Sequence, residues 1–163
     1  MTGFSNGFLL SDNFSFFAYQ STAQAAITGG GSIATLICDT EIFDPFNGYD
    51  PSTGLYTIPS TFPIGTWFFQ GKLTITGITS SHTTAIFSIT NSNRNLYCEI
   101  NAANSRTAGN ELTLQVCGFI NGLGSGSVIN PQIQVFGGSN VIGTKATGDQ
   151  WCDFGGIFIK PSS

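Results

Sequence analysis

Apolar and polar residues alternate along much of the chain, which is the pattern of strands with one buried face. In residues 72–76 the apolar side chains stand two apart, and Leu112, Leu114 and Val116 repeat that spacing. Segments rich in Gly, Asn and Ser separate these runs. The pattern predicts almost no helix. It predicts strands over residues 14–20, 32–38, 55–58, 66–76, 84–90, 95–100, 111–120, 127–136 and 154–160. Periodicity alone therefore predicts an all-β sandwich.

The chain of 163 residues suits one domain, which we place at residues 13–163. Residues 1–12 are predicted to form an N-terminal arm whose apolar residues contact a neighbouring molecule, with simple fraying as the alternative. These arm residues are Phe4, Phe8, Leu9 and Leu10. The first residues lack the basic segment and cleavage pattern of a secretory signal, so we expect synthesis in a cytoplasm.

Charge is scarce, and this narrows the classes of partner. Charged residues make up 9% of the chain, the net charge is −4, and the five Lys and Arg are spread singly. Without a basic patch we expect no nucleic-acid binding. No apolar run approaches the roughly 20 residues of a spanning helix, so we expect no membrane insertion. Fifteen Phe favour burial of one face in an oligomer, with a large aromatic core in a monomer as the alternative.

Candidate catalytic and metal-binding residues are few. His82 is the single histidine and lies in a polar turn, and no serine stands in a nucleophile elbow, so an enzyme is not expected. Cys38, Cys98, Cys117 and Cys152 lack the spacing of a zinc site. We expect free, buried thiols. Two disulfides are the alternative in an oxidising compartment, and spacing does not give their pairing.

Acidic residues concentrate between positions 39 and 50 as Asp39, Glu41, Asp44 and Asp50. Carboxylates this dense could hold a calcium ion if the fold brought them together, although no EF-hand loop is present. A solvated, mildly repulsive loop is the favoured interpretation. We therefore expect no cofactor, with calcium as the open alternative.

The two tryptophans allow a sugar-stacking hypothesis. Trp67 lies inside a predicted strand and is expected in the core. Trp151 lies between Gln150 and Cys152, before the last predicted strand. It is the better candidate for an exposed contact, with core packing as the alternative.

Turn and strand motifs follow a fixed order between residues 42 and 69. They are Phe43-Asp44, Asn47, Tyr49-Asp50, Gly54, Tyr56, Pro59, Gly65, Trp67 and Phe69. This order resembles the globular head of C1q, a branch of the C1q and tumour-necrosis-factor superfamily. The closing residues 154–159 are similar to that family's Phe-x-Gly-Phe-Leu-Leu strand. The family's Leu-x-Leu-x-x-Gly-Asp signature has no clear counterpart around residues 112–118 or 128–136.

The resemblance implies a jelly-roll β-sandwich of two antiparallel sheets that forms a homotrimer. It also implies a threefold interface lined by aromatic and aliphatic side chains, and calcium binding near the axis in some members. No calcium ligand of the family matches a position here. The aromatic residues that suit the interface are Phe17, Tyr19, Tyr56, Phe68 and Phe158.

These observations favour a structural virion protein. We expect a homotrimeric decoration or cement protein at the virion surface of a bacteriophage, made in the host cytoplasm, whose arm contacts the major capsid protein. The first alternative is a receptor- or glycan-binding module of a head or tail fibre, with ligand loops at 91–94, 104–106 and 137–140. Its candidate residues are Asn93, Arg94, Arg106 and Trp151. The second alternative is a secreted C1q-like signalling head cut from a longer precursor.

Overall fold

The computed structural model describes residues 15–92, 94–146 and 151–161. The predicted arm at residues 1–12 lies outside the described residues, and so does Asn93. The described chain forms twelve strands and one short helix. In chain order they are β1 (Ser15–Tyr19), β2 (Ile33–Thr35), β3 (Thr40–Phe43), β4 (Tyr49–Asp50), β5 (Leu55–Thr57), β6 (Gly65–Thr76), β7 (Thr84–Thr90), β8 (Asn95–Asn101), α1 (Ala102–Ser105), β9 (Leu112–Leu123), β10 (Val128–Phe136), β11 (Gly143–Thr144) and β12 (Asp153–Pro161).

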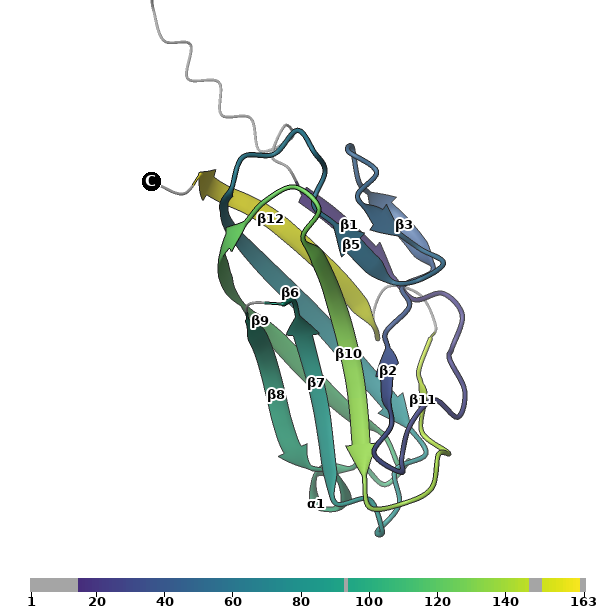
Figure 1. Ribbon diagram of the computed structural model, residues 1–163. Helices are drawn as coiled ribbons and strands as arrows, with labels where there is room; N and C mark the ends of the chain where they lie inside the picture. The colour runs from purple at the N-terminus through teal and green to yellow at the C-terminus, as the bar shows by residue number, and fades with distance from the viewer. Residues whose placement is uncertain (1–14, 93, 147–150, 162–163) are drawn as a thin grey trace, which may run out of the picture.

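Two antiparallel sheets pack face to face as a jelly roll (Figure 1). The first sheet has the order β11-β6-β12-β1-β3, with β9 on the other side of β6. The second has the order β4-β5-β10-β7-β8, with β2 also paired to β10. Strand β12 ends at one end of the sandwich, while α1 lies at the other (Figure 1).

All nine predicted strands are present, and the predicted all-β jelly-roll class is confirmed. The prediction missed β3, β4 and β11. Two of these have only two residues each, too few to show a period, and most side chains of β3 are exposed. Strand β9 also runs on to Leu123, past the predicted end at Ile120.

Aromatic rings fill the space between the sheets. Phe16 of β1 stacks on Tyr56 of β5 with ring centroids 3.9 Å apart and planes 9° apart, and on Tyr49 at 5.6 Å. Trp67 is fully buried, as predicted, and its ring contacts the rings of both Tyr56 and Phe69. Because the two sheets each contribute rings, burying this layer holds one sheet against the other.

The matched Phe-Asp and Tyr-Asp motifs close the turn between β3 and β4. Asp44 is buried, and its Oδ2 accepts the backbone N–H of Tyr49 at 2.7 Å, while Oδ1 accepts that of Phe46 at 3.2 Å. The Tyr49 hydroxyl then bonds both the N–H and the carbonyl of Cys38, at 3.1 and 2.9 Å. The motif therefore has a structural role, since it fixes Tyr49 against the ring layer.

Glycines provide the room that the rings need. A Cβ built on Gly156 would lie 2.7 Å from Phe69 Cδ1 and 2.8 Å from Phe16 Cε1. We expect Gly156→Ala to lower the free energy of unfolding by about 1–3 kcal/mol through overpacking, measured by urea unfolding. The matched control is Gly109→Ala, whose Cβ would meet its nearest neighbour at 3.7 Å. Equal urea midpoints for the two variants would contradict this account of the core.

Candidate functional site

The outer face of the first sheet carries exposed apolar side chains. Phe119 is 52% exposed, Ile157 42% and Phe43 37%, and Phe17 and Phe68 beside them are half-buried. These five residues are called the apolar patch below. An antiparallel sheet with one solvent-exposed face normally has polar residues on that face. Contiguous apolar residues there indicate a contact surface.

Strand register brings the apolar patch together. Phe68 of β6 pairs with Phe119 of β9 on one side and with Ile157 of β12 on the other. The Phe68 and Phe119 rings lie 5.2 Å apart. In the next row Phe17 of β1 pairs with Phe43 of β3. The patch therefore spans five strands that lie far apart in the sequence.

A hollow of about 150 Å³ interrupts the patch next to Gly155. Its walls include Phe17, Phe43, Phe68 and Ile157. Gly155 is needed there, because a Cβ would lie 2.8 Å from Phe17 Cδ2. The same face thus presents a hollow toward β1 and β3 and a protruding ring, Phe119, on β9.

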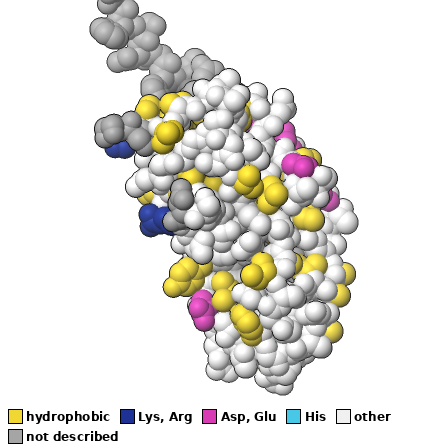
Figure 2. All heavy atoms as spheres, in the orientation of Figure 1, with side chains coloured by type: hydrophobic (Ala, Val, Ile, Leu, Met, Phe, Trp, Pro, Cys, Tyr) yellow, Lys and Arg dark blue, Asp and Glu magenta, His cyan; other side chains and the backbone are white. Residues whose placement is uncertain are grey.

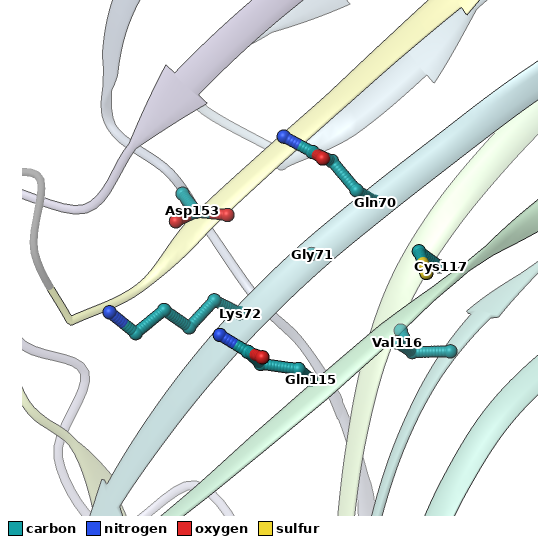
Figure 3. A pocket seen from close by; sticks show the side chains of 7 residues that line it. All are labelled: Gln70, Gly71, Lys72, Gln115, Val116, Cys117 and Asp153. Atoms are coloured by element: carbon teal, nitrogen blue, oxygen red, sulfur yellow. The ribbon is translucent and has the colours of Figure 1, made fainter.

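The outer face becomes polar farther along the strands. A second depression of about 260 Å³ lies there (Figure 3), lined by Gln70, Gly71, Lys72, Gln115, Val116, Cys117 and Asp153. Lys72 pairs with Asp153 of β12 and with Gln115 of β9 in the sheet register. The apolar patch is therefore bounded by polar groups on one side.

The structure separates the five predicted interface residues. Phe17, Tyr19 and Phe68 belong to the first sheet and are half-buried on its outer side. Tyr56 is 1% exposed and stacks on Phe16 in the core, so its interface assignment was wrong. Phe158 also points inward, with its ring edge-on to Trp67 at 5.4 Å, so it does not line the outer face.

Phe43, Phe119 and Ile157 were not predicted from the sequence as interface residues. The outward position of Phe119 could have been predicted from the alternation along its strand. Leu112, Leu114 and Val116 are buried, which places the odd-numbered positions of β9 outward. No such pattern predicted the position of Phe43, because β3 itself was not predicted.

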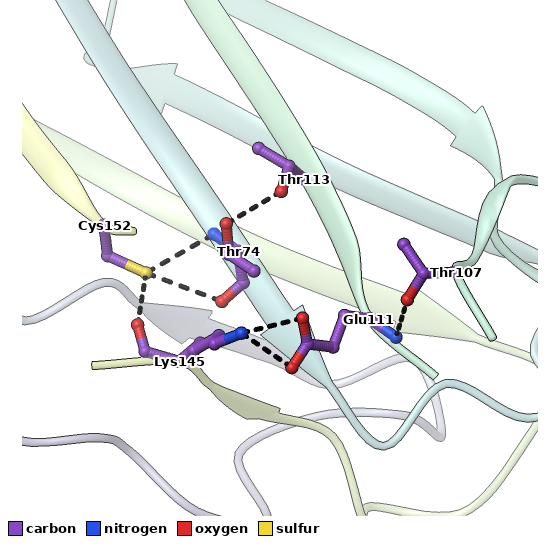
Figure 4. A network of polar contacts seen from close by, with 6 residues as sticks. All are labelled: Thr74, Thr107, Glu111, Thr113, Lys145 and Cys152. Carbon is purple, nitrogen blue, oxygen red and sulfur yellow. Dashed lines mark hydrogen bonds and ion pairs between the residues drawn. The ribbon is translucent and has the colours of Figure 1, made fainter. Parts of the chain in front are cut away.

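All four cysteines are described and are free thiols. Burial raises the pKa of Cys152 to about 11, and its Sγ accepts the Thr74 N–H at 3.4 Å (Figure 4). Burial also raises the pKa of Cys38 well above its ordinary value. Cys117 is exposed, so the expectation of buried thiols was wrong for this residue.

The acidic residues do not converge on an ion. Asp39 accepts the backbone N–H groups of Ser21 and Thr22 at 2.6 and 3.0 Å. Burial opposes its ionisation, but these hydrogen bonds outweigh that effect and lower its pKa. Within the described ranges no group of three or more His, Cys, Asp or Glu could hold a metal ion. The interpretation of a solvated loop was wrong for Asp44, which is buried as a turn cap.

His82 is buried at the α1 end of the sandwich, and its Nδ1 accepts the backbone N–H of Thr79 at 3.0 Å. That bond lies within the turn from Thr79 to His82 and gives the imidazole a structural role there. No helix among the described residues is long and apolar enough to cross a membrane.

The predicted ligand residues lie apart. Arg94 precedes β8 and Arg106 follows α1, so they lie at opposite ends of β8. Trp151 is half-buried, and the Lys145 ammonium covers its ring at 3.9 Å from the centroid. Lys145 also bonds both carboxylate oxygens of Glu111 at 2.9 Å (Figure 4). One face of the Trp151 ring is therefore already occupied and cannot stack on a sugar.

No protein-family model and no curated protein sequence matches the chain. Solved structures do match it. Two are crystal structures of murine APRIL, at pH 5.0 with a TM-score of 0.59 and 8% identity, and at pH 8.0 with 0.58 and 9%. Each match covers 91% of this chain and 100% of the other. Identity this low shows the fold alone, so the chain is a jelly roll of the tumour-necrosis-factor and C1q type.

Proposed function

We propose that this protein is a non-enzymatic head that assembles into a homotrimer through the outer face of its first sheet. The apolar patch is the observation that carries the proposal. Three of its five contiguous side chains are exposed and two are half-buried, and burial against another copy would remove them from water. The motifs between Phe43 and Phe69 favour the C1q branch within this fold.

The outer face carries two complementary surfaces that can form the heterologous contact of a closed ring. A cyclic trimer requires a heterologous contact, in which two different surfaces of each copy meet. The face offers two such surfaces: the Phe119 ring on β9, and the hollow beside Gly155 across β12, β1 and β3. Insertion of Phe119 of one copy into the hollow of the next would repeat around a closed ring.

Phe119→Ser tests this contact. We expect the association constant to fall at least about tenfold, because a buried aromatic anchor is lost. The measurement is size-exclusion chromatography with light scattering over a range of concentrations. The control is Tyr97→Ser, at a residue that is 65% exposed on β8 of the other sheet. Equal association of both variants and the unmodified chain would contradict the assignment of this face.

We further propose that the trimer serves as a decoration or cement protein on a bacteriophage capsid. Jelly rolls recur among viral capsid domains, which is support by analogy. The scarcity of charge also suits a protein whose surface is largely covered in an assembly: the space-filling view has few blue or magenta side chains (Figure 2). The arm residues Phe4, Phe8, Leu9 and Leu10 would contact the major capsid protein.

Quantitative mass spectrometry of purified virions from the source tests this role. We expect the protein in a simple copy ratio to the major capsid protein, because a decoration protein repeats with the shell lattice. Deleting residues 2–12 should weaken attachment and leave the trimer folded. Absence from virions would overturn the virion role, and undiminished attachment would overturn the role of the arm.

The second candidate function is recognition of a host ligand. The observation that favours it is a polar groove beside Arg106, at the α1 end of the sandwich. A copy number far below that of the major capsid protein would favour this role over decoration.

A further inference from the structure

An open groove of about 640 Å³ lies at the α1 end of the sandwich. This is the end opposite to the one where β12 finishes (Figure 1). The residues that line it are Ser80, Ala103, Asn104, Arg106, Thr107, Ala108 and Asn110. The lining combines one cation with amide and hydroxyl groups, and it contains no carboxylate and no large apolar side chain.

Arg106 is a charge without an internal counter-charge. Its side chain is half-buried, and its Nη1 donates to the carbonyl of Ala103. Within the described part of the chain Arg106 forms no ion pair. Glu111, the nearest acidic residue along the chain, has both carboxylate oxygens bound by Lys145 at 2.9 Å (Figure 4). The remaining N–H donors of the guanidinium are therefore available to a ligand that carries an anion.

Hydrogen bonds hold the walls of the groove in place. The Thr107 N–H donates to the carbonyl of Glu111 at 2.8 Å, and the Asn110 N–H donates to the carbonyl of Thr107 at 3.0 Å. The Asn101 side chain accepts the N–H of Asn104 at 3.0 Å. A site that is formed before the ligand arrives loses less entropy on binding.

We propose that this groove binds an acidic sugar, with the carboxylate of the sugar at Arg106 and its hydroxyls at Asn104, Thr107 and Asn110. The volume falls within the range of about 300–1,000 Å³ that is usual for small-ligand sites. One cation suits one carboxylate, whereas a nucleic acid requires several cations to neutralise its phosphates. Amide and hydroxyl groups around a single charge match a ligand with one anion and many hydroxyls.

Ligand-observed NMR titration of the full chain tests the proposal with glucuronate, galacturonate and N-acetylneuraminate. Glucose serves as the neutral counterpart of glucuronate, and acetate carries the charge without the hydroxyls. We expect at least one acidic sugar to bind at least about tenfold more tightly than glucose and acetate, because charge and hydroxyls contribute together. Binding of none of the three, or equal binding of glucose, would overturn the proposal.

Two arginines at opposite ends of β8 give a matched pair of variants. Arg106→Gln should weaken binding of the acidic sugar at least about tenfold, Arg106→Lys should retain part of it, and Arg94→Gln should leave it unchanged. Thermal melting confirms that each variant is folded. Unchanged binding by Arg106→Gln, or an equal loss in Arg94→Gln, would overturn the site. Phe119→Ser should bind the sugar normally, so failure of the groove and failure of self-association are separate results.

Discussion

Phe16 stacks on both Tyr49 and Tyr56, and this ring contact joins the first sheet to the second. Side chains alternate strictly along a strand, so the phase that sends Phe16 inward sends Phe17 outward. The same rule on β12 places Phe154 and Gly156 inward and Ile157 outward. The outward positions of Phe17, Phe68 and Ile157 thus follow from the phase that the ring layer fixes in β1, β6 and β12.

The long strands were predictable because their alternation is local. Leu112, Leu114 and Val116 show a buried face without reference to any other strand. The error at Tyr56 has a physical cause: an aromatic residue in a strand fits a core or an interface equally well, and only its stacking on Phe16 decides. Whether a side chain points into the core or to the outer face depends on which strands lie beside it. Neighbouring strands are often distant in the sequence, so a local pattern does not identify them.

The groove at Arg106 was even harder to predict from the sequence, because distant segments form it. Arg106 was predicted to lie on a ligand loop together with Arg94 and Trp151, but those two residues lie elsewhere. The groove needs residues near position 80 and residues 103–110 to meet at one end of the sandwich. Lys145, from a third segment, binds Glu111, which is the nearest acidic residue to Arg106 along the chain. Contacts between three distant segments have no periodic signature.

Assembly is assigned to one side of the molecule and ligand recognition to one end, and copies are expected to meet through the apolar patch. Hydroxyl-radical footprinting of the unmodified protein, at low and at high protein concentration, measures this contact. Oxidation of Phe43, Phe119 and Ile157 should fall when the protein is concentrated, while Tyr97 on the other sheet should be oxidised equally in both samples. Equal oxidation of the patch at both concentrations, or protection of Tyr97 in its place, would show that copies do not meet through the apolar patch.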